Sequence, residues 1–62
     1  MRRRLAQKLV DAWDGLGRGT KWAIEQIAGS GIWAAIEGGV GAVVDFLSDC
    51  SDWVVEKINN LF

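Results

Sequence analysis

Four carboxylates in the second half of the sequence follow a helical spacing, and they are the residues best placed to do chemistry. Glu37, Asp45, Asp52 and Glu56 share one helix face with Gly41 and Ser48, because three- and four-residue steps return to the same side of a helix. A row of carboxylates can line a water-filled passage for cations, and it is equally typical of a solvated face. The candidate polar face comprises Glu37, Gly41, Asp45, Ser48, Asp52 and Glu56.

Catalytic and metal-binding patterns are absent from the sequence. It contains one cysteine, Cys50, and no histidine, so it cannot supply the usual ligands of a zinc site. Three glycines precede Thr20 and Lys21, but their spacing is not that of a phosphate-binding loop. We expect no enzymatic activity, no metal or other cofactor and no small-molecule substrate. Cys50 lies on an apolar face, and we interpret it as a small buried side chain. An intermolecular disulfide and lipidation are the alternatives.

Positive charge gathers at the start of the chain, in Arg2, Arg3, Arg4 and Lys8. Such a cluster can bind anionic lipid headgroups, at about 1 kcal/mol for each side chain near a charged surface. It can also serve as a solubilising tail, or pair between molecules with the acidic C-terminal half. The net charge of −1 argues against a nucleic-acid partner.

Four tryptophans are a large number for 62 residues. The indole ring is apolar and carries one N–H donor, so it suits the boundary between lipid headgroups and acyl chains. Packing in a small helical core is the alternative interpretation. The candidate interface anchors are Trp13, Trp22, Trp33 and Trp53.

Hydrophobic periodicity predicts an all-α chain. The absence of proline agrees with this prediction. We expect the chain to form one small unit over residues 1–62. Glycine clusters mark the expected breaks, and Thr20 is a candidate N-cap. The expected helices are 3–15, 20–28, 31–47 and 51–61, the last two being either separate or continuous. Three or four short amphipathic helices would then form a compact bundle in water or a helical oligomer at a membrane.

Small residues in the third predicted helix recur at four-residue spacing, which allows close approach of helix backbones. The candidate packing positions are Gly31, Ala35, Gly38, Gly39 and Ala42. The apolar pattern continues in phase through these glycines, so we expect the helix to continue through them or to bend only slightly. Segment 27–44 is long enough to span a bilayer but contains Glu37. A helix lying at the membrane interface, or spanning with its polar face toward other copies, is therefore preferred.

The stretch GSGIWAAIEGGVGAVVDFL, residues 29–47, resembles the central segment of the β-type phenol-soluble modulins, which are small cytolytic peptides. The resemblance covers about a third of the chain. It implies a leaderless, helical, self-associating and membrane-active peptide. The matching positions are Gly29, Ile32, Glu37, Gly39, Val40 and Gly41.

The stretch VVDFLSDCSDW is similar to part of the small cell-wall channel peptides of corynebacteria, through Asp45, Phe46, Leu47, Ser51 and Trp53. Some members of that group carry a mycolate ester on a serine, and this resemblance makes Ser30 the acylation candidate. The Arg-rich start and the four tryptophans are similar in general character to leaderless bacteriocins. Those are usually strongly cationic, whereas this chain is not.

These observations predict a small exported peptide that self-associates, inserts in a membrane and permeabilises it or forms a channel. A porin-like channel in the producer's own envelope and a non-lytic helical subunit of a larger assembly are the alternatives. The expected partners are a lipid membrane, further copies of the chain or a second helical peptide. The start of the chain lacks the uninterrupted apolar region of a signal peptide, so we expect a secreted or envelope-associated protein without a cleavable signal.

Overall fold

Five α-helices and one 3-10 turn make up the structure, a computed structural model that describes residues 2–61. The all-α prediction is confirmed, although the number of helices is higher than the three or four expected. In chain order the elements are α1 (Arg2–Ala12), η1 (Trp13–Gly15), α2 (Arg18–Ala28), α3 (Gly31–Gly38), α4 (Val40–Ser48) and α5 (Asp52–Asn59).

Helix α1 buries one narrow apolar stripe formed by Leu5, Ala6 and Leu9. Trp13 continues this stripe into η1, which closes with the Leu16 N–H donating to the Trp13 carbonyl at 3.1 Å. Together α1 and η1 occupy nearly the range predicted for the first helix. Glycine-rich sequence then separates them from the next helix.

Helix α2 begins two residues earlier than predicted, at Arg18, with Gly17 as its N-cap. Thr20 therefore lies inside the first turn and does not cap the helix. The other end agrees with the prediction, because Gly29 takes φ = 96° and its N–H donates to the Glu25 carbonyl at 2.7 Å. A positive φ of this size is readily adopted only by glycine.

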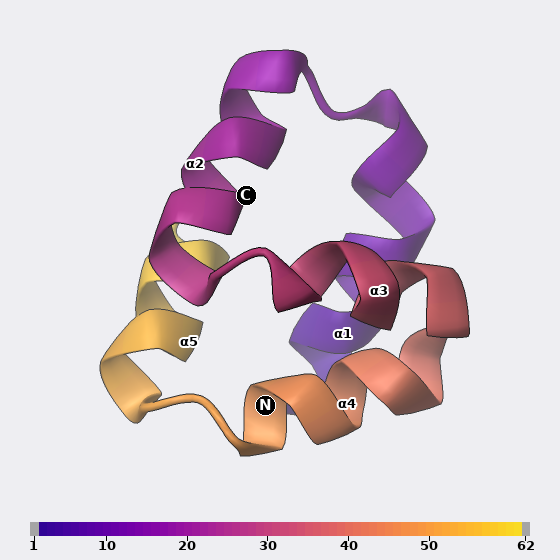
Figure 1. The fold of residues 1–62 in the computed structure, drawn as a ribbon, viewed down its shortest axis with the longest axis vertical. Coiled ribbons are helices and arrows are strands. Elements are labelled where there is room, and N and C mark those ends of the chain that lie inside the picture. Colours follow the sequence, from indigo (N-terminus) through magenta and orange to yellow (C-terminus); the bar gives the residue numbers. More distant parts are fainter. Residues whose placement is uncertain (1, 62) are drawn as a thin grey trace.

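The predicted helix 31–47 is wrong, since it is divided into α3 and α4 at Gly39. Gly39 takes φ = 94° and ψ = −173°, which is incompatible with a continuing α-helix. Its N–H donates to the Ile36 carbonyl at 3.2 Å, and its own carbonyl accepts from Val43 at 3.1 Å. One residue thus ends α3 and starts α4, and the two helices lie side by side in opposite directions (Figure 1).

Residues 49–51 separate α4 from α5, so helices 31–47 and 51–61 are not continuous. The last turn of α4 closes with the Asp49 and Cys50 N–H groups donating to the Phe46 and Leu47 carbonyls. Ser51 is extended at the N-cap of α5. Asp52 in its first turn and Lys57 in its last turn suit the helix dipole.

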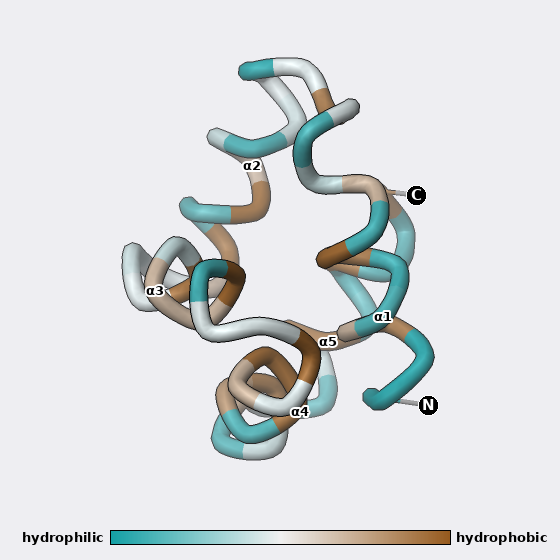
Figure 2. The backbone as a smooth tube through the Cα atoms, turned by 90° about the vertical axis from the view of Figure 1, so that its right-hand side faces the viewer, coloured by the Kyte–Doolittle hydropathy of each residue, from teal (hydrophilic) through white to brown (hydrophobic). Residues whose placement is uncertain are grey.

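The core is entirely apolar and lies where the five helices meet. Helix α1 packs on α4, α3 on α4, and α2 on both α3 and α5. Polar and apolar residues alternate along the helices (Figure 2), as expected for amphipathic elements that surround one core. The buried side chains are Leu5, Ala6, Leu9, Trp13, Ile24, Ile32, Ala35, Val43, Leu47, Val54, Val55 and Ile58.

The Cα radius of gyration, 10.0 Å, shows that the chain closes on itself. A compact protein of this length is expected near ~10.6 Å, and a continuous helix over 31–61 would be about 46 Å long against a longest extent of 24 Å. Of the two alternatives drawn from the sequence, the structure therefore shows the compact bundle. Val43 and Leu47 are fully buried in α4, which packs on α1, because the hairpin at Gly39 turns that face inward.

Candidate functional site

The predicted polar face is divided among three helices. Glu37 lies on α3, Gly41, Asp45 and Ser48 on α4, and Asp52 and Glu56 on α5. All six residues are exposed, as a solvated face requires. The Ser48 hydroxyl donates to the Val44 carbonyl of its own helix at 2.8 Å. In this structure the six residues do not make one continuous helix face.

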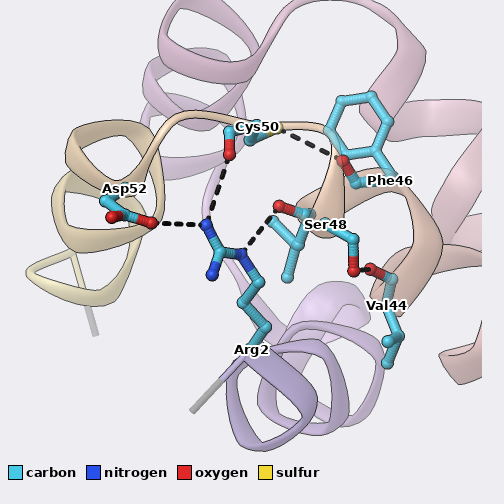
Figure 3. Close-up of polar contacts among 7 residues, drawn as sticks. Arg2, Val44, Phe46, Ser48, Cys50 and Asp52 are labelled. Atoms are coloured by element: carbon cyan, nitrogen blue, oxygen red, sulfur yellow. Dashed lines mark hydrogen bonds and ion pairs between the residues drawn. The ribbon is translucent and has the colours of Figure 1, made fainter.

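Arg2 links the two ends of the chain (Figure 3). Its Nε donates to the Leu47 carbonyl at 3.0 Å, and its Nη2 donates to the Cys50 carbonyl at 3.3 Å and to Asp52 Oδ1 at 2.6 Å. The guanidinium thus caps the C-terminal end of α4, where carbonyl groups lack helical partners. We call this set of contacts the Arg2 clasp. Its contact between Arg2 and Asp52 is the one ion pair found within residues 2–61.

Pairing between molecules was one of the interpretations of the basic cluster, whereas the Arg2–Asp52 pair forms within one molecule. Arg2 is 35% exposed, which places part of its guanidinium against the fold. Arg3, Arg4 and Lys8 are exposed on α1. The four predicted headgroup contacts therefore divide into one structural residue and three surface cations.

A groove of about 570 Å³ lies between α1 and α4. It combines residues from two predicted groups, the basic start and the polar face, with two valines and a glutamine. The residues that line it are Arg3, Gln7, Val40, Gly41, Val44 and Asp45. Gln7, Val40 and Val44 were not predicted as site residues, since no local pattern indicates which faces of two distant helices form a groove. A smaller cavity of about 150 Å³ adjoins the Arg2 clasp, between Asp52, Val55 and Glu56.

The four tryptophans have two different environments. Trp13 is buried, with its ring edge-to-face against Trp33 at a centroid distance of 5.1 Å and an angle of 83°. Lys21 Nζ lies 5.5 Å from the Trp13 ring centroid, in cation–π range. Trp22, Trp53 and Trp33 are 63%, 59% and 41% exposed. One tryptophan is therefore in the core, and three lie at the surface on α2, α3 and α5.

The small residues bring α3 and α4 close together within one molecule. A Cβ atom on Gly38 would lie only 2.7 Å from the Cβ of Ala42, and one on Gly31 would lie 3.0 Å from the Phe46 ring. Ala35 is buried between these positions in sequence. Gly39 differs, because no atom lies within 4 Å of its Cβ position and its positive φ makes the turn.

Cys50 and Ser30 are the two residues considered for modification. Cys50 is half-buried, and its Sγ donates to the Phe46 carbonyl at 3.4 Å. Burial raises the pKa of the Cys50 thiol, Asp49 raises it further and Arg2 opposes them, so the protonated thiol is favoured. Ser30 is exposed at the N-cap of α3, and its side chain makes no capping hydrogen bond.

Two further properties bear on the possible chemistry. Within the part of the chain that the structure describes, no three His, Cys, Asp or Glu residues are grouped so that they could hold a metal ion. Over residues 2–61, none of the helices combines the length and the apolar character needed to cross a bilayer.

Comparison with protein-family models, with curated protein sequences and with solved structures gave no match to this chain. The structural features that bear on function are three exposed tryptophans, an exposed cationic face on α1, the α1–α4 groove and an apolar core closed by the Arg2 clasp.

Proposed function

We propose that this protein binds lipid bilayers and permeabilises them after its helices separate at the membrane surface. The observation that carries the proposal is the exposure of Trp22, Trp33 and Trp53. A protein with so few residues leaves three of its largest apolar side chains in solvent. At a bilayer surface the ring would enter the acyl region while the N–H keeps a polar partner.

Charge supports the same surface chemistry. Arg3, Arg4 and Lys8 project from α1 into solvent, where they would attract anionic headgroups. The clustering of these charges gives the N-terminal helix a local positive potential despite the net charge of −1. We therefore expect the first encounter with a membrane to involve α1.

The composition of the core makes opening on lipid feasible. Among the described residues, no polar or charged side chain is buried, so the helices could turn their inner faces toward acyl chains without carrying a charge into them. Separation of α1 would expose Val43 and Leu47 of α4. Short amphipathic helices would then lie in the interface, with Glu37, Asp45 and Asp52 toward water and the glycine and alanine positions free to pack against other copies.

Leakage and binding measurements test this proposal. We expect the purified protein to release dye from anionic vesicles at micromolar concentration, with a blue shift of tryptophan emission. Changing Arg4→Gln should weaken binding more than Arg18→Gln, because Arg18 is an exposed cation outside the cluster on α1. Lack of both binding and leakage would contradict the proposal and favour a non-lytic subunit of a larger assembly.

Circular dichroism tests the opening step separately. The edge-to-face pair of Trp13 and Trp33 should give a near-ultraviolet signal that disappears when the helices separate, while the far-ultraviolet helix signal remains. Arg2→Met should increase leakage per bound molecule, because the clasp no longer holds α1 to α4. A near-ultraviolet spectrum that persists during leakage would contradict opening.

A further inference from the structure

The α1–α4 groove has the volume of a small-ligand site. Its volume, about 570 Å³, lies within the ~300–1,000 Å³ range of ligand pockets. Arg3 and Gln7 are four residues apart on α1, so they present one helix face. Val40 and Val44, and likewise Gly41 and Asp45, are four residues apart on α4 and form the opposite wall.

The two walls carry opposite charges. Arg3 supplies a guanidinium on the α1 side, and Asp45 supplies a carboxylate on the α4 side. The ion pair found in the described part of the chain joins Arg2 and Asp52, so Arg3 and Asp45 are not neutralised by each other. A ligand that fits this groove should therefore carry a negative and a positive group separated by a short link.

We propose that the groove binds the aminophosphate headgroup of a zwitterionic phospholipid, with phosphate on Arg3 and a primary ammonium on Asp45. This inference rests on the proposed function and adds the lipid class. Guanidinium groups bind phosphate oxygens through paired N–H donors, and a primary ammonium offers three donors to a carboxylate. Val40 and Val44 contact the adjacent apolar part of the lipid.

Gly41 leaves space for such a ligand. A Cβ atom at this position would meet no atom within 4 Å, so the α4 wall is open beside Asp45. Because Gly41 lines the groove, a larger side chain here is expected to occupy part of it. Gly41→Leu is therefore a second way to block the site that leaves both charged groups in place.

Other headgroups match the groove less well. An anionic phosphoglycerol headgroup has a phosphate for Arg3 but no cation for Asp45, whose carboxylate would repel it. A choline headgroup has the two charges, but its quaternary nitrogen has no N–H to donate to the carboxylate. The groove should thus favour phosphatidylethanolamine over phosphatidylcholine, and the preference should depend on Asp45.

Vesicle titrations followed by tryptophan emission test this selectivity. Binding to phosphatidylcholine vesicles is compared with binding to mixed phosphatidylcholine and phosphatidylethanolamine vesicles. We expect the mixed vesicles to bind about fivefold more tightly, the ratio for an exposed charge pair of ~1 kcal/mol. Arg3→Gln, Asp45→Asn and Gly41→Leu should each bring the ratio toward one. Arg4→Gln and Asp14→Asn make the same charge changes outside the groove and should keep the ratio.

The control variants also exclude a general effect of phosphatidylethanolamine on bilayer packing, which would act on all variants equally. Soluble phosphoethanolamine should shift the Gly41 amide resonance of the wild type and not that of Asp45→Asn. Equal ratios for Arg3→Gln and Arg4→Gln, or a wild-type ratio of one with leakage intact, would overturn the groove proposal alone. Loss of all vesicle binding and leakage would overturn the proposed function as well.

Discussion

Alanine at Gly39 and alanine at Gly41 should change stability in opposite directions. Gly39 adopts φ = 94° and ψ = −173°, a region that is nearly restricted to glycine. An L-side chain there is strained by ~1–3 kcal/mol, and no atom within 4 Å of the Cβ position adds packing. Alanine loses less backbone entropy than glycine on folding, which offsets ~0.4–1 kcal/mol of this strain. We therefore expect Gly39→Ala to lower the free energy of unfolding by about 1–2 kcal/mol.

Gly41 has open space around its Cβ position as well, but it lies inside α4 with helical geometry. Alanine is preferred to glycine by up to ~1 kcal/mol in a helix, so Gly41→Ala should stabilise the protein. Urea denaturation followed by the far-ultraviolet helix signal measures both changes. A continuous helix through residue 39 would be stabilised by both alanines, and that result would refute the hairpin.

Chemical synthesis allows a sharper version of the same test, because the chain is short. The backbone angles of Gly39 are the mirror image of an extended conformation that L-residues adopt freely. A D-alanine in place of Gly39 should therefore stabilise the protein, where L-alanine destabilises it. Equal effects of the two enantiomers would show that residue 39 does not hold a positive φ.

Three further predictions concern the contacts that close the fold. Arg2→Met should lower the free energy of unfolding by about 1–2 kcal/mol through lost hydrogen bonds to two carbonyls, whereas Arg4→Met should change it by less than ~0.5 kcal/mol; equal effects in urea denaturation would contradict the clasp. Gly38→Ala should destabilise by ~1 kcal/mol or more, because its Cβ would lie 2.7 Å from that of Ala42, and a rise in melting temperature would refute this. Burial raises the pKa of Cys50 in the folded state, so its contribution to stability is present below the ordinary thiol pKa of about 8.5 and is lost as pH rises through the higher folded value; the free energy of unfolding of the wild type should fall over this range relative to Cys50→Ser, and a relative rise would contradict the shift.

The all-α fold class and most helix limits could be predicted from the sequence, because they depend on local signals. The glycines before residue 20 and the cluster at Gly29 interrupt apolar periodicity, and the structure ends or starts helices there. Gly39 was missed because the apolar pattern stays in phase across it. Gly38 and Gly41 are helical whereas Gly39 is not. The choice among them depends on packing of α3 against α4, which no local pattern contains.

The candidate site was predictable only in its parts. The basic start and the polar face were identified, but not that Arg2 would separate from its neighbours and join α4 to α5. The groove is lined by residues such as Arg3 and Asp45, which are far apart in sequence. Periodicity gives the face of each helix, whereas the partner of that face is decided by the turns between helices.

The proposed function requires one sequence to form both a closed bundle and a membrane-bound form, and the short helices would allow this. Each of the helices has 11 residues or fewer, a length at which an isolated helix is marginal in water. Their stability must come from burial of their apolar faces. A core without polar side chains supplies that burial in water, and acyl chains could supply it at a bilayer. If the helices open as proposed, the polar contacts of the Arg2 clasp would be lost, so these contacts favour the closed bundle. A lipid phosphate that replaces Asp52 as the partner of Arg2 would shift the balance toward opening.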